Sequence, residues 1–498
     1  MAIELSTLTF TDQDDIVPAS GEEQIVNTGV ANTLAGNDTI SGIEAGYEPF
    51  SPGSQYGFFN SGTFNTAEGS DVITGIGSLG GIINSGTFNT AEGNDIITGN
   101  SYIIGIHTTN TFNTGEGDDV VTGTGNGEGI TISGIFDSGD GNDIITAQAS
   151  YVTGLKNTGT FNSGNGNDII TANIFNGTGL ENTGTFNTGK GDDIISGNGA
   201  GLNNTFGLKN TGTFNTDEGD DVITGKGLEG GITISGTFDT GDGNDRISGN
   251  SRIVRYGSPT GISISFSSTF NTGDGNDTIE SSGVNGLFNG GLINTGNGKD
   301  IITGDSVFVG NSSRGIANAG TINAGNDDDI ITADSVSNYG NIDMSNGNDT
   351  ITSTGVIYSE GVIETGNGDD SIIVNVTAAG YGIYNNGGAI NMGDGNDSII
   401  ANKGFESSPN SSGAWFLGEG DDYIKGFGSG DFYGGNGNDT LELTPGTYTV
   451  GIWGEGGESP IFTKGNQLMI TSEFEKLKAG GTIYDFSSLT AGQIIIVT

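Results

Sequence analysis

Hydrophobic and polar positions recur along this chain in a unit of about 24 residues, T-F-N-T-G-x-G-N-D-x-I-x-G. An aromatic or aliphatic residue lies seven positions before the Asp of each unit, and a second aliphatic residue lies two positions after it. The first series comprises Phe64, Phe88, Phe112, Phe136, Phe161, Phe186, Phe214, Phe238, Phe270, Ile293, Ile322, Ile342, Ile363, Ile390, Trp415 and Phe432. The second series includes Ile73, Ile97, Val121, Ile145, Ile170, Ile195, Ile223, Ile247, Ile279 and Ile302. This fixed register identifies a repeat protein.

The unit predicts short β-strands separated by turns. A helix does not tolerate two Gly and an Asn-Asp pair in every unit, whereas short β-branched and aromatic runs between Gly-rich turns are typical of strands. Each unit is then one coil of a parallel β-solenoid, and equivalent residues of successive coils stack at about 4.8 Å. The sequence therefore predicts an all-β fold, a single right-handed parallel β-solenoid of about 17 coils, with the two hydrophobic series pointing inward as two columns.

The repeats define the expected domain boundaries. Residues 1–30 contain no clear unit and are expected to form an N-terminal cap over an otherwise open sheet edge. Residues 31–441 carry the repeats, and residues 442–498 form a different, more apolar segment that is expected to cap the other end.

Composition and charge restrict the partners. Gly accounts for 95 of the 498 residues, there is no Cys, and 61 acidic against 14 basic residues give a formal charge of −47. Nucleic acid and anionic membranes attract clusters of Lys and Arg, so neither binding to nucleic acid nor membrane insertion is expected. The start, MAIELSTLTFTDQDD, has neither the basic nor the apolar region of a cleaved signal peptide. A divalent cation is the partner that this charge favours.

The Asp of each unit is the candidate metal ligand. Two Gly before it permit a tight turn in which backbone carbonyls and the carboxylate face a common point, and Ca²⁺ prefers such oxygen ligands. The predicted calcium ligands are Asp38, Asp71, Asp95, Asp119, Asp143, Asp168, Asp193, Asp221, Asp245, Asp277, Asp300, Asp329, Asp349, Asp370, Asp397, Asp422 and Asp439. One ion in each of the 16 gaps would reduce the charge from −47 to about −15. The alternative is that each Asp only caps backbone N–H groups.

The turns carry a family resemblance. Gly115-Glu116-Gly117-Asp118-Asp119, Gly164-Asn165-Gly166-Asn167-Asp168 and Gly435-Asn436-Gly437-Asn438-Asp439 resemble the RTX (haemolysin-type) calcium-binding repeat, G-G-x-G-x-D-x-U-x. Here the first Gly of that pattern is mostly Thr or Ser, and each coil has one such turn where the family has two. The resemblance implies a β-roll that binds calcium through the Asp and the turn carbonyls, folds outside the cell, and leaves by type I secretion through an uncleaved C-terminal signal, here within 442–498.

Two further columns have more than one interpretation. Asn65, Asn89, Asn113, Asn162, Asn187, Asn215 and Asn271, with Asp at 137 and 239, form either an amide ladder or a contact for a ligand or partner. Thr63, Thr87, Thr111, Thr160, Thr185 and Thr213 precede the inward Phe by one position and so point outward beside these Asn residues. This Thr-x-Asn face is a lattice contact, an ice-ordering surface or an inert solvated face.

The sequence favours a structural function over catalysis. His107 is the only His, and paired carboxylates occur in every coil, so no acid/base site is singled out. The expectation is a secreted, extracellular, calcium-binding protein of the cell surface that folds and stiffens on calcium and self-assembles into a surface layer, sheath or filament. The alternatives are a binding module, either a glycan or surface adhesin or an ice-binding rod, and then a polysaccharide-acting enzyme.

Overall fold

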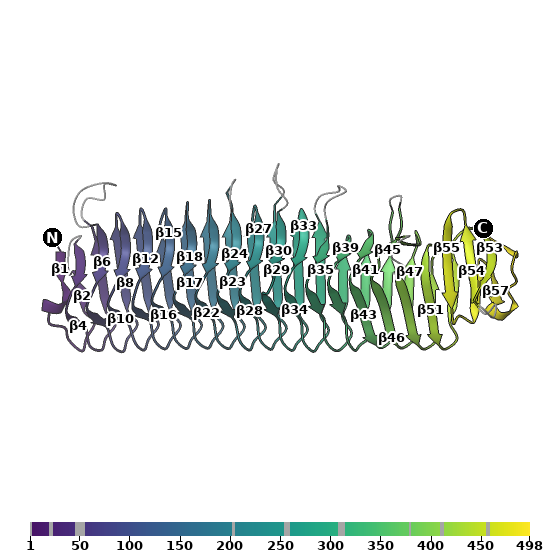
Figure 1. The fold of residues 1–498 in the computed structure, drawn as a ribbon. Helices are drawn as coiled ribbons and strands as arrows, with labels where there is room; N and C mark the ends of the chain where they lie inside the picture. The colour runs from purple at the N-terminus through teal and green to yellow at the C-terminus, as the bar shows by residue number, and fades with distance from the viewer. Residues whose placement is uncertain are drawn as a thin grey trace. The chain divides into compact units, whose positions relative to one another are not determined.

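The computed structural model describes residues 2–18, 23–44, 55–201, 205–252, 259–306, 314–377, 380–408, 413–454 and 459–498. The chain divides into two compact units, Met1–Ser263 with Ser268–Phe270, and Ile264–Ser267 with Asn271–Thr498. Each unit is a parallel β-solenoid, and the predicted all-β fold is confirmed (Figure 1). Within the described residues, no helix has the length and apolar character needed to cross a membrane.

Three parallel sheets, here called A, B and C, build the first unit, and each coil contributes strands in the order C, B, A along the chain. Sheet A contains β1 (Ala2–Glu4), β3 (Gln24–Asn27), β6 (Tyr56–Asn60), β9 (Gly80–Asn84), β12 (Ile104–Thr108), β15 (Glu128–Ile132), β18 (Thr153–Asn157), β21 (Thr178–Asn182), β24 (Phe206–Asn210) and β27 (Gly230–Ile234). Sheet B contains β2 (Ile16–Val17), β5 (Thr39–Ile43), β8 (Val72–Gly77), β11 (Ile96–Ser101), β14 (Val120–Thr124), β17 (Ile144–Ala149), β20 (Ile169–Ile174), β23 (Ile194–Gly199), β26 (Val222–Gly227) and β29 (Arg246–Ser251). Sheet C contains β4 (Val30–Asn32), β7 (Thr63–Asn65), β10 (Thr87–Asn89), β13 (Thr111–Asn113), β16 (Ile135–Asp137), β19 (Thr160–Asn162), β22 (Thr185–Asn187), β25 (Thr213–Asn215) and β28 (Thr237–Asp239).

The second unit repeats this arrangement. Its A strands are β33 (Asn285–Asn289), β36 (Ile316–Asn318), β39 (Val336–Asn338), β42 (Ile357–Ser359), β45 (Ile383–Asn385) and β48 (Phe405–Ser407). Its B strands are β32 (Thr278–Gly283), β35 (Ile301–Ser306), β38 (Ile330–Ala333), β41 (Thr350–Ser353), β44 (Ser371–Val374), β47 (Ser398–Ala401), β50 (Tyr423–Lys425) and β52 (Thr440–Leu443). Its C strands are β34 (Leu292–Asn294), β37 (Thr321–Asn323), β40 (Asn341–Asp343), β43 (Val362–Asn367), β46 (Ala389–Asp394), β49 (Ala414–Glu419) and β51 (Gly430–Asn436). In sequence, β30 (Thr260–Ile264) and β31 (Thr269–Asn271) span the division between the units.

The terminal segments differ from the repeats. At the N-terminus, β1 and β2 pair in parallel with β3 and β5, and the 3-10 helix η1 (Leu5–Thr7) buries Leu5. After residue 442 the pairing becomes largely antiparallel, although β55 and β56 still pair in parallel with β51 and β52. The elements of this segment are β53 (Gly446–Trp453), β54 (Ser459–Lys464), β55 (Gln467–Ser472), β56 (Lys476–Ala479), β57 (Thr482–Asp485), η2 (Phe486–Ser488) and β58 (Ile494–Val497).

The core consists of three buried columns, one from each sheet. The Phe series on sheet C and the aliphatic series on sheet B point inward as predicted, and neighbouring rings such as Phe186 and Phe214 stack with centroids 4.7 Å apart. The third column, on sheet A, is absent from the sequence prediction; in the first unit it comprises Phe58, Ile82, Ile106, Ile130, Leu155, Leu180, Leu208, Ile232 and Ile262. These residues mostly lie six positions before the Phe. They fall between the Ile of one unit and the Phe of the next, where the units differ in length, so alignment on the Asp did not reveal them. Counting back from the Phe would have revealed them.

Candidate metal-binding turns

All 17 predicted ligand Asp residues lie in the turns that connect a sheet C strand to the next sheet B strand. Every one of them is buried, with a relative exposure of 2% or less. Within each unit, the turns stack so that equivalent Asp residues of successive coils are neighbours. The structure therefore forms the predicted columns of carboxylates, one in each unit.

Glycine makes this stacking possible. In the turn before Asp119, Gly115 and Gly117 have φ angles of +99° and +139°. A Cβ on Gly117 would lie 2.0 Å from the carbonyl oxygen of Gly93 in the preceding coil, which is far inside van der Waals contact. The glycine pattern therefore reflects close approach of backbone between coils, in addition to the turn geometry.

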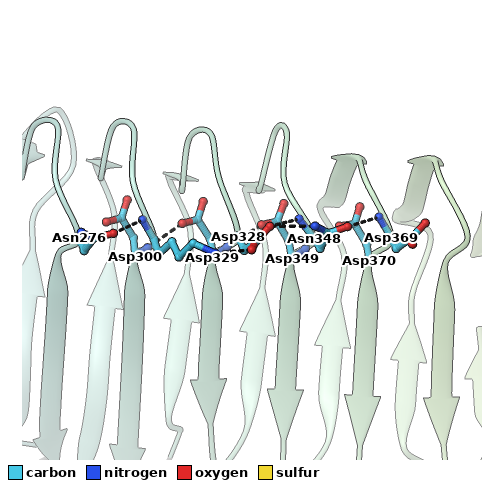
Figure 2. Close-up of polar contacts among 9 residues, drawn as sticks. Asn276, Asp300, Asp328, Asp329, Asn348, Asp349, Asp369 and Asp370 are labelled. Atoms are coloured by element: carbon cyan, nitrogen blue, oxygen red, sulfur yellow. Dashed lines mark hydrogen bonds and ion pairs between the residues drawn. The ribbon is translucent and has the colours of Figure 1, made fainter.

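One carboxylate oxygen of each buried Asp has a structural role. The Oδ1 atom accepts a hydrogen bond from the backbone N–H of the equivalent Asp in the preceding coil, for example at 2.7 Å from Asp95 N to Asp119 Oδ1 and 2.8 Å from Asp119 N to Asp143 Oδ1. Figure 2 shows the same arrangement in the second unit, where Asp300 N donates to Asp329 and Asp329 N donates to Asp349. The predicted alternative, capping of backbone N–H groups, is thus confirmed for Oδ1.

The second carboxylate oxygen has no such partner. In 15 of the 17 residues, the Oδ2 atom is buried and makes no hydrogen bond. Several of the hydroxyl groups at the start of the turn donate to a carbonyl of the next coil, as from Thr216 to the carbonyl of Thr240 at 3.1 Å. The residues are Asp38, Asp71, Asp95, Asp119, Asp143, Asp168, Asp193, Asp221, Asp300, Asp329, Asp349, Asp370, Asp397, Asp422 and Asp439. A buried anionic oxygen without a partner is strongly unfavourable.

Burial changes the protonation of these groups. It raises the pKa of Asp193 to about 6, of Asp95 to about 7 and of Asp221 to about 8. In each case burial outweighs the lowering by the adjacent Thr hydroxyl and by the backbone N–H bound to Oδ1. Without a counter-ion, the column is therefore close to its protonation range at neutral pH.

A second ladder, absent from the sequence prediction and here called the outer ladder, lies on the solvent side of the buried column. An Asn, Asp or Ser before a buried Asp accepts, through its side chain, the backbone N–H of the equivalent residue in the following coil; Lys299, which precedes Asp300, has no acceptor and interrupts the series. Asn276 accepts from Lys299 at 2.9 Å, Asp328 from Asn348 at 2.9 Å, and Asn348 from Asp369 at 2.9 Å (Figure 2). The two ladders run in opposite directions along the stack. The preference for Asn or Asp at this position was the available signal.

Each column extends one residue beyond the predicted set. In the first unit, Asp15 N donates to Asp38 Oδ1 at 2.8 Å. In the second unit, Asp439 N donates to Glu475 Oε2 at 2.7 Å. The N-terminal extension could have been found, because Asp14-Asp15-Ile16-Val17 repeats the pattern of Asp118-Asp119-Val120-Val121. Glu475 belongs to a segment with no repeat register.

The donor chemistry of the turns fits a hard cation. The unpartnered Oδ2 atoms are carboxylate oxygens, which are hard ligands. In the described part of the chain, no three His, Cys, Asp or Glu side chains gather into one metal-binding group. A cation in these turns would therefore take at most two carboxylates and complete its shell with carbonyl or water oxygens.

The Asn column on sheet C forms the predicted amide ladder. Asn113 donates to Asn89 at 2.8 Å, and Asn215 donates to Asn187 at 2.9 Å. The Thr residues beside it point outward, and Thr160, Thr185 and Thr213 are exposed. Part of this Thr-x-Asn face is a shallow trough of about 690 Å³ between β16 and β28.

A separate, buried amide ladder runs along sheet A. Asn157 donates to Asn182 at 2.9 Å, and Asn182 donates to Asn210 at 2.8 Å, all three with no exposed surface. The second N–H of Asn182 reaches the carbonyl of Thr213 at 2.8 Å. This ladder ties the corner between sheets A and C, and it is a structural element that the sequence analysis missed.

His107 lies on β12, on the outward side of sheet A, and is half-buried. Burial lowers its pKa, and the nearby Glu128 carboxylate raises it by less.

Comparison with known proteins gives similarity to solved structures alone. No family model and no curated protein matches this chain. A solved structure that matches is a hyperactive, Ca²⁺-dependent, β-helical antifreeze protein from an Antarctic bacterium, at 14% identity over 93% of this chain and 96% of that chain, with a TM-score of 0.29. At this identity and TM-score, the similarity carries no argument about what this chain binds.

Proposed function

We propose that this chain is a calcium-binding structural protein whose folding depends on the ion. The observation that carries the proposal is the buried carboxylate oxygen without a partner, repeated in 15 turns. Successive carboxylates stand about 4.8 Å apart, so their mutual repulsion adds to the cost of burial. Calcium between neighbouring turns would offset both the cost of burying the carboxylates and their mutual repulsion. The hydrogen bonds described for the turns leave Oδ2 without a partner and so do not offset these costs.

The residues that would hold the ion are the Asp residues of the two columns, through Oδ2, together with carbonyl oxygens of the glycine turns. The chain contributes orientation: each Oδ1 is fixed by the N–H of the preceding coil, so Oδ2 is held in place. Calcium supplies positive charge and accepts six to eight oxygens at flexible geometry. Because the carboxylates come together only when the coils stack, the binding free energy of the ion is also folding free energy.

We further propose that the protein acts outside the cell, where calcium is available. There it would self-associate and serve as a structural component of a surface layer, sheath or filament. A cell-surface glycan is a candidate anchor. This proposal is supported by the RTX-like turns and by the formal charge of −47, which a high calcium concentration would offset. Catalysis is not part of the proposal: the one His lies half-buried on a strand face, and the carboxylates are equivalent from coil to coil.

Calcium removal tests the proposal. Circular dichroism in excess EGTA at pH 7.5 should show a largely disordered chain, and millimolar Ca²⁺ should restore β-structure, whereas Mg²⁺ at the same concentration should do so poorly. Isothermal titration should give several ions per chain. A β-rich spectrum that is the same with and without chelator would reject the proposal.

The Thr-x-Asn face favours a second candidate function, a surface that binds ice or an ordered polar partner. Its regular array and shallow trough supply the specific observation. The variant Thr160→Lys/Thr185→Lys/Thr213→Lys should abolish thermal hysteresis if the face binds ice. Absence of thermal hysteresis in the wild-type protein would remove ice binding.

A further inference from the structure

A column of exposed aliphatic side chains runs along the outer surface of sheet B in the first unit. The first residue of each strand from β8 to β26 points outward, and five of the seven are 37% to 46% exposed. They stack in register, as in the pairing of Ile144 with Ile169 and of Ile169 with Ile194. The column comprises Val72, Ile96, Val120, Ile144, Ile169, Ile194 and Val222.

A column of hydroxyl residues lies beside it, at the third position of the same strands. Its members are Thr74, Thr98, Thr122, Thr146, Thr171, Ser196 and Thr224. The fifth positions, which also point outward, are occupied by Ile76, Asn100, Thr124, Gln148, Asn173, Asn198 and Lys226. We call the surface of these 21 residues the Ile–Thr face.

The Ile–Thr face carries no carboxylate, in a chain with 61 acidic residues. Lys226, at its margin, is the one charged side chain among the 21. The other surfaces of this unit carry acids: sheet A holds Glu128 and Glu181, sheet C holds Asp137 and Asp239, and the turns hold the outer ladder. This face is therefore the one on which two copies of the acidic chain can approach without bringing carboxylates together.

We propose that the Ile–Thr face is the interface between two copies of this chain. The proposal deepens the proposed function, because it rests on self-association and assigns it to a surface. Exposed aliphatic columns of this extent are uncommon on monomeric proteins and mark contacts. Since the same patch occurs on both copies, a two-fold arrangement pairs each aliphatic column with its counterpart across the interface.

The size of the face fits a reversible dimer. Seven strands at about 4.8 Å spacing, each contributing five residues at about 3.3 Å, give a face of about 550 Å². Two copies would bury about 1,100 Å², which lies just below the range of specific, stable interfaces and suits a weak, reversible contact. The flat sheets would pack about 10 Å apart through the aliphatic and Thr side chains. Because the contact is apolar between two anions, added salt should strengthen it by screening the long-range repulsion.

The test uses two matched triple variants of the full chain. Ile144→Lys/Ile169→Lys/Ile194→Lys places three Lys residues on the Ile–Thr face. Thr160→Lys/Thr185→Lys/Thr213→Lys places three on sheet C, on strands β19, β22 and β25 of the same stretch of chain. Both change the net charge equally and point outward. Sedimentation equilibrium in millimolar Ca²⁺ measures association, and circular dichroism separately reports folding.

The proposal expects the wild-type protein to dimerise and the Ile–Thr variant to associate at least tenfold more weakly, with the sheet C variant unchanged. If the Lys variant does not fold, Ile144→Thr/Ile169→Thr/Ile194→Thr retains strand propensity and removes the aliphatic column, and it should weaken association as well. A folded wild-type protein that stays monomeric at 100 µM, an unchanged Ile–Thr variant, or an equal loss in both variants overturns the proposal. Because association is measured on folded protein, a chain that folds without calcium would reject the calcium proposal and leave this test valid.

Discussion

Substitution of a single buried carboxylate separates its structural role from its metal-binding role. Asp221 is fully buried; its Oδ1 accepts the N–H of Asp193 at 2.8 Å, and its Oδ2 has no partner. In Asp221→Asn, the amide oxygen can still accept that N–H, while an uncharged NH₂ replaces the unpartnered anionic oxygen. The variant therefore keeps the hydrogen bond and removes the charge.

The expected effect has opposite signs with and without calcium. Burial raises the pKa of Asp221 to about 8, so without calcium the residue is ionised in the unfolded chain at pH 6 and protonated in the folded one. The pKa of 3.8 in the unfolded chain lies about two units below pH 6, so protonating the residue on folding costs about 3 kcal/mol at this pH. Asn avoids this cost, so Asp221→Asn should stabilise the calcium-free fold by up to about 3 kcal/mol. With calcium it should destabilise the fold, because a ligand is lost.

Two measurements check this reversal. Urea unfolding in EGTA at pH 6, with trimethylamine N-oxide to retain the folded state, should give a higher midpoint for Asp221→Asn than for the wild type. Calcium titration at pH 7, followed by circular dichroism, should require more calcium for half-folding. The control is Asp220→Asn, which removes the same charge from the adjacent, exposed residue of the outer ladder; its Oδ1 accepts the N–H of Asn244 at 2.7 Å. A variant that is destabilised in EGTA and unaffected in calcium would refute the reasoning.

Three other outcomes are expected. In EGTA, the pKa values of the buried Asp residues, raised to about 6 to about 8, mean that the folded chain binds more protons than the unfolded one. Folding should therefore be favoured below about pH 4 and lost as the pH rises through 6 to 8. Circular dichroism that shows loss of structure on acidification would contradict this. Phe161→Ala removes a buried ring whose centroid lies 5.2 Å and 4.3 Å from those of its two stacked neighbours. In calcium it should lower the free energy of unfolding, measured from urea unfolding, by about 3–5 kcal/mol. The control Thr160→Ala, at the adjacent outward residue, should change it by less than about 0.5 kcal/mol. Deletion of residues 442–498 should leave the protein inside the producing cell, and normal export of the truncated chain, detected by immunoblotting of medium and cells, would reject the secretion role of that segment.

The sequence predicted the coil and its turns because their determinants are local. The period-two alternation around Phe161 and Ile170 places both residues inward, and the Gly residues of the intervening turn permit the corner. Since identical residues in identical register must stack, a fixed spacing from Phe to Asp to Ile was sufficient to predict parallel pairing, two of the three core columns, the column of Asp and the amide ladder on sheet C.

The roles of individual atoms were decided by the tertiary structure. Whether a carboxylate oxygen is partnered depends on an N–H about 24 residues away, and sequence spacing does not show that Oδ1 of Asp119 receives the Asp95 N–H while Oδ2 receives nothing. Burial of Asn182 and the absence of carboxylates from the Ile–Thr face likewise follow from stacking, because both are properties of a column and only become visible when coils are placed side by side. The sequence by itself determined which residues recur and where the strands turn, whereas the stacked fold decided which oxygens are left without partners and which face is free of carboxylates, since hydrogen bonding and burial are set by neighbours in space.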